Sequence, residues 1–241
     1  MGLATILAAV AAALAALGTG LKKLLTGSRT IAGVLVRTPT DDTTIGDDGA
    51  VRSIQAADIL LPDEMLRELW APETLERLAR TYWAFLSAVT LGFIRVYYTE
   101  GERYVCLLHP RLRLLTFRAP EYELEATRGI VRWRIERGLL VAPKGRGGNG
   151  YLEIDVRLLP CDVPRKGRVN VEVEVANFYP MIASRLGRFL YTNTQSRIHV
   201  IVTHGFLRRI AKRNLEESIT GRFRVPPPEE TRRPRRAHLR A

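Results

Sequence analysis

Three segments in the second half of the chain alternate strictly between apolar and polar side chains. Residues 131–136 read Val-Arg-Trp-Arg-Ile-Glu, residues 152–157 read Leu-Glu-Ile-Asp-Val-Arg, and residues 169–175 read Val-Asn-Val-Glu-Val-Glu-Val. A period of two residues is typical of β-strands, whose side chains point alternately to the two faces of a sheet. Because one face is apolar and the other charged, the pattern predicts an antiparallel sheet covered on one side only.

The segment before these strands is predicted to hold a first strand and two helices. The strand is Ile59-Leu60-Leu61, and a short helix follows Pro62. A second helix opens at Pro72, where a missing amide donor is tolerated, and its apolar residues recur at spacings of three and four. Four further strands, separated by turn-forming residues, are predicted over 93–98, 104–108, 111–117 and 122–126.

After Pro180 the pattern becomes helical. A short helix is predicted over 181–191, and a capping box at Thr192 and Gln195 starts a long last helix that runs to about Leu215. An apolar row follows one side of this last helix, which suits it to cover a sheet. The row consists of Ile198, Val202, Phe206 and Ile210.

The regions outside this pattern differ from it in composition. Residues 1–25 begin with an uncharged, Ala-rich stretch followed by Lys22 and Lys23, which predicts a membrane anchor with the folded domain on the cytoplasmic side. A cleaved signal and an ordinary helix stay open as alternatives. Residues 26–55 are rich in turn formers and are predicted to be a flexible linker. One domain is expected over 56–216, and a basic disordered tail over 217–241.

The net charge of +12 indicates an anionic partner, if the charge has a specific partner at all. Residues 221–241 carry seven arginines and two glutamates, so an anionic membrane surface is one candidate. Nucleic acid is disfavoured, because no aromatic residue interleaves the arginines after Phe223. The sequence does not give the oligomeric state, and two cysteines indicate a reducing compartment rather than a disulfide framework.

Motifs for chemistry are weak. Residues 145–150 fit Gly-x-Gly-x-x-Gly, but they lead into a strand rather than a helix, so they are read as a flexible loop. His199 and His204 are five residues apart and do not converge on a metal, as helical ligands four apart do. No nucleophile motif is present, and we expect no metal, no cofactor and no catalytic residue. Glu153 and Asp155 are predicted to pair with arginines of a neighbouring strand, as a charge lattice on the polar face.

The order of elements resembles that of the START-like (SRPBCC) superfamily over residues 56–216. The resemblance rests on Ile59-Leu60-Leu61-Pro62, the strand series from Phe93 to Val175, Asn177-Phe178-Tyr179-Pro180, and the helix through Phe206-Leu207. It implies an α+β helix-grip fold, in which a curved antiparallel sheet wraps around a long C-terminal helix, with two short helices after the first strand. Members bind lipids, sterols, polyketides or plant hormones, and some are cyclases or aromatases. The superfamily has no universal catalytic residue, so none is transferred.

A sheet with one apolar face needs a cover, and one helix cannot fill a strongly curved sheet, so a cavity between them is predicted. His199 is expected to be a buried, hydrogen-bonded histidine, with a polar contact to the ligand as the alternative. The predicted ligand-binding residues are Tyr97, Trp133, Ile135, Leu152, Ile154, Val173, His199, Val202 and Phe206.

The sequence thus favours binding or carriage of a hydrophobic small molecule or lipid at a membrane. Catalysis is not favoured, although a polyketide cyclase-like or aromatase-like enzyme remains the alternative. A third hypothesis is a non-catalytic, membrane-associated interaction module with a filled core. A cavity with two or more polar groups of shifted pKa would favour the enzyme, and an apolar cavity would favour the carrier.

Overall fold

The computed structural model of the chain describes residues 29–31, 34–36 and 40–181. In this part, eleven antiparallel strands form one sheet, and two α-helices connect the fourth strand to the fifth. The strands are β1 (Arg29–Ile31), β2 (Val34–Val36), β3 (Thr40–Ile45), β4 (Val51–Pro62), β5 (Ile94–Tyr98), β6 (Glu102–Leu107), β7 (Arg113–Arg118), β8 (Glu121–Leu124), β9 (Arg128–Arg137), β10 (Tyr151–Leu159) and β11 (Lys166–Phe178). The helices are α2 (Asp63–Leu69) and α3 (Pro72–Val89), with a 3-10 turn at Pro143–Gly145.

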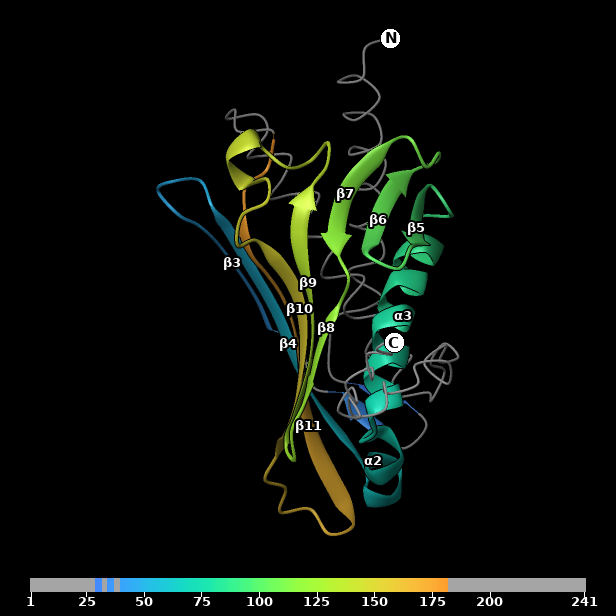
Figure 1. Cartoon of the computed structure of the whole chain (residues 1–241). Coiled ribbons are helices and arrows are strands. Elements are labelled where there is room, and N and C mark those ends of the chain that lie inside the picture. Colours follow the sequence, from blue (N-terminus) through green and yellow to red (C-terminus); the bar gives the residue numbers. More distant parts are fainter. Residues whose placement is uncertain (1–28, 32–33, 37–39, 182–241) are drawn as a thin grey trace, which may run out of the picture.

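The sheet places its first long strand beside its last. β4 pairs with β11, and β10, β9, β7, β6 and β5 follow in that order (Figure 1). β2 and β3 pair with the other edge of β4, and β8 pairs with β9. Because β4 and β5 lie far apart in the sheet, the connection between them, which is α2 and α3, must cross one face of it.

The face on which α3 packs, here called the inner face, carries the apolar residues predicted from the alternation. Ile59 of β4 lies opposite Val169 of β11, and Val171 lies opposite Val156 of β10. The outer face carries the charged residues, among which Glu153 lies opposite Arg132. The two-residue period of the sequence therefore describes β9, β10 and β11 correctly.

The linker prediction for 26–55 is wrong for residues 29–31, 34–36, 40–45 and 51–55, which belong to β1, β2, β3 and β4. β3 reads Thr-Asp-Asp-Thr-Thr-Ile, and such polar residues suit a strand at the edge of a sheet, where charged side chains remain in water. The turn formers after it close the β3–β4 hairpin, in which Gly49 has a φ of +79° that favours glycine. Turn-rich composition thus marked a hairpin rather than a linker.

α3 begins at Pro72, as predicted, and its apolar face is buried. Trp83 packs edge-on against Trp133 of β9, with 5.3 Å between ring centroids, and lies 5.5 Å from the ring of Phe117 of β7. Leu75 lies over Gly129, where a Cβ atom would come within 2.8 Å of Leu75 Cδ2. These contacts fix α3 over β9 and define the core of the domain.

The prediction of an α+β fold is confirmed by the mixture of one antiparallel sheet with α2 and α3. The predicted segment 1–25, all but the first residue of the helix predicted over 181–191, the helix over 192–215 and the tail 217–241 lie outside the described residues. Within the described ranges, no helix is long and apolar enough to cross a membrane.

Candidate ligand-binding cavity

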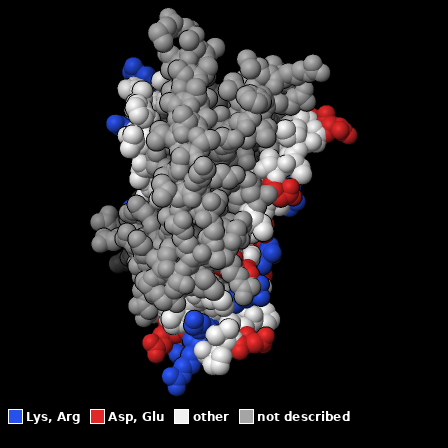
Figure 2. All heavy atoms as spheres, turned by 180° about the vertical axis from the view of Figure 1, so that it is seen from behind, with Lys and Arg blue, Asp and Glu red and all other residues white. Residues whose placement is uncertain are grey.

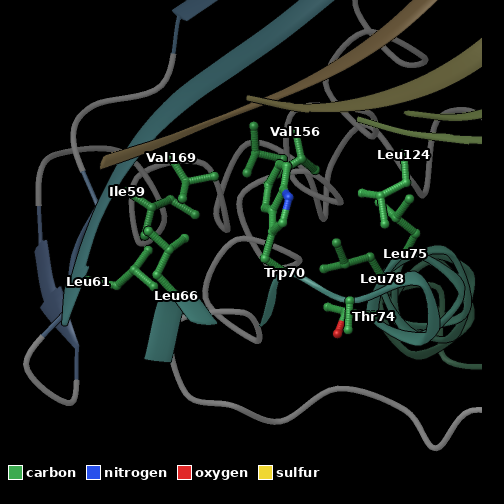
Figure 3. Close-up of a pocket in the computed structure, with 12 residues that line it drawn as sticks. Ile59, Leu61, Leu66, Trp70, Thr74, Leu75, Leu78, Leu124, Val156 and Val169 are labelled. Atoms are coloured by element: carbon green, nitrogen blue, oxygen red, sulfur yellow. The ribbon is translucent and has the colours of Figure 1, made fainter. Parts of the chain in front are cut away.

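An apolar cavity of about 30 Å³ lies between the sheet and the junction of α2 with α3 (Figure 3). The sheet contributes side chains of β4, β8, β10 and β11, and the helices contribute the opposite wall. The lining consists of Ile59, Leu61, Leu66, Trp70, Ala71, Thr74, Leu75, Leu78, Leu124, Val156, Val169 and Val171.

The sheet side of the cavity follows from strand register. Val156, Val169 and Val171 point to the inner face because alternate residues of neighbouring strands share a face. Leu124 reaches the same face from β8, opposite Gly129 of β9. The absence of a side chain at Gly129 leaves room for Leu75, so a glycine in β9 shapes one side of the cavity.

Among the lining residues, Trp70 lies between those of β4 and α2 and those of α3 (Figure 3). It caps the C-terminus of α2, and its backbone N–H donates to the carbonyl of Leu66 at 3.0 Å. The segment Trp70-Ala71 alone joins α2 to α3, so the indole is carried by a short connection rather than by a helix or strand. Trp70 is half-buried, whereas Trp83 and Trp133 are fully buried.

The cavity is almost free of polar groups. The hydroxyl of Thr74 and the indole N–H of Trp70 are the polar side-chain groups of its lining. The lining contains no titratable side chain. A cavity without titratable groups cannot supply an acid or a base, so it suits a hydrophobic ligand better than acid–base chemistry.

Five of the predicted ligand-binding residues lie together on the inner face. Leu152 is opposite Trp133, and Ile154 is opposite Val173. These four and Ile135 are each at most 4% exposed and belong to the core, beside the cavity rather than in its lining.

Of the other four predicted ligand-binding residues, the structure describes Tyr97 alone. Tyr97 alternates with Val96, which packs on the core, and the ring of Tyr97 stacks on Tyr104 at 5.6 Å. It therefore lies on the opposite face of the sheet. His199, Val202 and Phe206 lie outside the described residues.

Trp70 is the functional candidate that the sequence reasoning missed. A large aromatic residue directly before Ala71-Pro72, between two helices, was the available signal. Trp70 lies outside the apolar spacing of both predicted helices. Periodicity alone therefore could not predict which way its side chain points. Leu75 and Leu78 were placed correctly on the apolar side of α3, although not in a cavity.

The outer face is the predicted charge lattice. Arg132 Nε donates to Glu153, as expected, while Arg134 pairs with Glu121 at 3.2 Å instead of with Asp155. Asp155 accepts hydrogen bonds from Arg128 at 2.7–3.2 Å and also pairs with Arg157. Figure 2 likewise shows positive and negative side chains as neighbours at the lower end of the molecule, where α2 and the β10–β11 connection lie. Glu121, Glu153 and Asp155 of the outer face are engaged in ion pairs, which explains them without catalysis.

Glu172 is the exception in this lattice. It lies opposite Asp155 in the adjacent strand and beside Glu174 along its own strand. Burial raises the pKa of Glu172 above its ordinary value, Glu174 and Asp155 raise it further, and Arg157 opposes them. Two carboxylates directly opposite each other are unfavourable, so the ion pairs around them offset a local repulsion. The described residues contain no cluster of His, Cys, Asp and Glu suited to a metal ion.

Comparisons with known proteins give remote likenesses only. No known family model matches the sequence, and no curated protein matches it. A solution NMR structure of a protein from Arthrobacter aurescens is 12% identical, covers 66% of this chain and 86% of its own, and has a TM-score of 0.31. Human STARD10 is 9% identical, and the likeness covers 72% of this chain and 73% of the STARD10 chain, with a TM-score of 0.32. CalU16 from Micromonospora echinospora is 15% identical, and the likeness covers 73% of this chain and 91% of the CalU16 chain, with a TM-score of 0.25. Likenesses this remote assign neither a family nor a function.

Proposed function

We propose that this chain binds and carries a hydrophobic small molecule or lipid between its sheet and the helices that cover it. The proposal includes a helix-grip, START-like fold, with the predicted helix over 192–215 lying on the inner face. The strand order supports this fold. The last strand, β11, lies within the sheet between β4 and β10, so a helix that follows β11 in the chain can fold back onto the inner face. His199, Val202 and Phe206 of that helix would then complete the ligand site.

The observation that carries the proposal is the apolar cavity at the α2–α3 junction. Its walls come from four strands and from α2, α3 and the connection between them, so it lies between the sheet and the helices. Apolar walls hold apolar ligands because their contact removes hydrocarbon surface from water. The scarcity of polar groups favours carriage over catalysis.

The size of the cavity determines how a ligand enters. A volume of about 30 Å³ holds only a small group, since one water needs about 10–15 Å³ of such space. A lipid-sized ligand needs several hundred Å³, on the order of 300–1,000 Å³. In the proposal, the tip of the ligand occupies the cavity, and Trp70 moves aside for the remainder. Trp70 lies on a two-residue connection rather than within a helix or a strand, which supports this displacement.

The membrane part of the proposal rests on the chain ends. Residues 1–25 would anchor the protein with the domain on the cytoplasmic side, and the arginines of 217–241 would attract anionic lipid. A carrier held at a membrane exchanges apolar ligands with that membrane directly.

A second candidate function is an interaction module without a ligand. The observation that favours it is the small cavity volume, because the inner face around Trp133 is already packed by Trp83 and Phe117. In that case, the inner face serves stability alone.

Native mass spectrometry of the full chain, purified from its own host, tests the proposal. We expect a co-purifying lipid or other apolar molecule on the wild type. Ala71→Leu adds a side chain to the cavity lining and is expected to lose the adduct. Ala142→Leu is the matched control, because Ala142 is likewise a half-buried residue at the start of a helical turn, but outside the cavity. Absence of the adduct from the wild type would support the interaction module instead, and retention of the adduct by Ala71→Leu would show that the ligand does not bind in this cavity.

A further inference from the structure

One end of the molecule carries exposed apolar side chains on two neighbouring turns. The turn from α3 to β5 holds Leu91 and Phe93, and the turn from β6 to β7 holds Leu108; these three residues are here called the apolar tip. The backbone N–H of Leu108 donates to the carbonyl of Phe93 at 2.7 Å. This bond continues the pairing of Ile94 with Leu107 at the ends of the two strands. The two turns therefore lie side by side, at the upper end of the sheet in Figure 1.

The apolar tip is open to solvent. Leu91 is 73% exposed, and Phe93 and Leu108 are each 48% exposed, which makes them the three most exposed large apolar side chains that the structure describes. Single exposed apolar residues are ordinary on a protein surface, whereas a group of them at one place marks an interaction site. The apolar tip is therefore a candidate contact surface.

The backbone of the apolar tip is unfavourable for leucine. The φ angle is +52° at Leu91 and +59° at Leu108, in the left-handed region that glycine and asparagine adopt more readily than leucine does. Both side chains are largely exposed, so packing within the domain offsets little of this cost. Strained positions of this kind are common at binding surfaces. The two leucines thus suit a contact outside the domain better than they suit the fold.

Basic residues flank the apolar tip, and the segments that form it carry no acidic residue. The sequence has no Asp or Glu over 77–99 or over 103–120. Arg95 Nε donates to the carbonyl of Gly92 at 3.2 Å, so this guanidinium lies beside the first turn, and Arg111 is exposed in the second. At the same end, which is at the upper left in Figure 2, the visible face shows basic and uncharged side chains without an acidic one.

Apolar side chains flanked by cations fit the surface of a membrane that contains anionic lipid. The apolar groups enter the boundary between headgroups and acyl chains, and the cations remain near the lipid phosphates. We propose that the apolar tip inserts into such a membrane surface, with Arg95 and Arg111 at the level of the headgroups. The inference rests on the membrane part of the proposed function and not on the cavity, because the apolar tip needs no ligand.

The test places the environment-sensitive fluorophore nitrobenzoxadiazole on Leu91→Cys in the full chain. Cys161→Ser removes the more accessible native thiol, since Cys106 is buried. The same label on Val163→Cys is the matched control. Val163 is likewise an exposed apolar residue, but it lies between β10 and β11, at the other end of the molecule (Figure 1). The vesicles consist of phosphatidylcholine, with or without phosphatidylserine.

We expect the emission of the label at position 91 to rise and shift to the blue with vesicles that contain phosphatidylserine, and that of the label at position 163 to stay unchanged. Arg95→Gln and Arg111→Gln should each lower the insertion constant about fivefold, the effect of one cation near an anionic surface. No change at position 91, equal changes at both positions, or equal insertion into vesicles without phosphatidylserine would overturn the proposal. A blue-shifted signal without vesicles that grows with protein concentration would show that a second copy covers the apolar tip, which also overturns it.

Leu108→Asn separates membrane insertion from stability. Asparagine adopts the left-handed backbone more readily than leucine, so we expect the midpoint of thermal unfolding to stay or to rise. The variant lacks one apolar side chain of the apolar tip, so the label at position 91 should insert about tenfold more weakly. Undiminished insertion, or a lower midpoint, would contradict the proposal. Failure of these tests leaves the co-purification test of the cavity unaffected, so the two proposals fail separately.

Discussion

The indole of Trp83 meets that of Trp133 edge-on, with 76° between the ring planes and 5.3 Å between the centroids. This contact joins α3 to the centre of the sheet. Trp133→Ala removes a side chain that is 1% exposed, and we expect it to lower the free energy of unfolding by about 3–5 kcal/mol. Urea unfolding measures the change. Trp70→Ala is the comparison, and an equal loss in both variants would mean that Trp70 is a core residue too.

Trp70→Ala is expected to enlarge the cavity and to strengthen binding of an apolar ligand. The wild-type chain must displace the indole before a long ligand enters, and that step reduces the apparent affinity. A gain of about tenfold for palmitic acid would correspond to about 1.4 kcal/mol. Isothermal titration calorimetry of both proteins checks it, and weaker binding by the variant would show that Trp70 contacts the ligand rather than obstructing it.

Glu172→Gln is expected to raise the free energy of unfolding at neutral pH. Burial raises the pKa of Glu172 in the folded state above its ordinary value of 4.5. At a pH above the folded-state pKa, ionised Glu172 therefore lowers the free energy of unfolding, whereas below pH 4.5 the side chain is protonated in both states and this cost disappears. The advantage of the variant should therefore shrink as the pH falls from 7 towards 4. Denaturant unfolding across this range shows it, with Glu100→Gln, in an exposed turn, as control. A difference independent of pH would exclude this explanation.

Asp155→Asn is expected to destabilise the sheet by about 1–3 kcal/mol, because hydrogen bonds to a charged group are lost at a buried position. The Asp155 side chain is 3% exposed, whereas the side chains of Arg128 and Arg157 are 41% and 42% exposed. When the ion pairs are lost, water can replace the hydrogen bonds of the two arginines but not those of residue 155. Thermal unfolding measures the loss. Glu123→Gln, whose side chain is 55% exposed, should change little. A similar effect in both variants would contradict the role given to burial.

The sheet could be predicted well where the alternation is strict. The pairing of Arg132 with Glu153 followed from the pattern, because a two-residue period fixes both faces of a strand. β5 lacks such a pattern, since Tyr97 and Tyr98 are consecutive aromatic residues. Sequence alone therefore could not show that Tyr97 faces away from the core.

The cavity and the β3–β4 hairpin depend on contacts between distant segments. Trp70 reaches the cavity because α2 and α3 cross the sheet from β4 to β5, and no local pattern encodes that crossing. β3 is polar because it lies at an edge of β4, so its residues resemble a linker until the partner strand is known. Local periodicity describes the faces of elements, whereas a cavity depends on how those faces meet.

The central claim, that an apolar ligand enters beside Trp70, is tested most directly by fluorine NMR. The full chain is labelled with 5-fluorotryptophan, and its three tryptophan signals are assigned by single Trp→Phe variants. On titration with palmitic acid, the claim predicts a saturable shift of the Trp70 signal, larger than those of Trp83 and Trp133. An unchanged Trp70 signal, or equal shifts of all three, would contradict it.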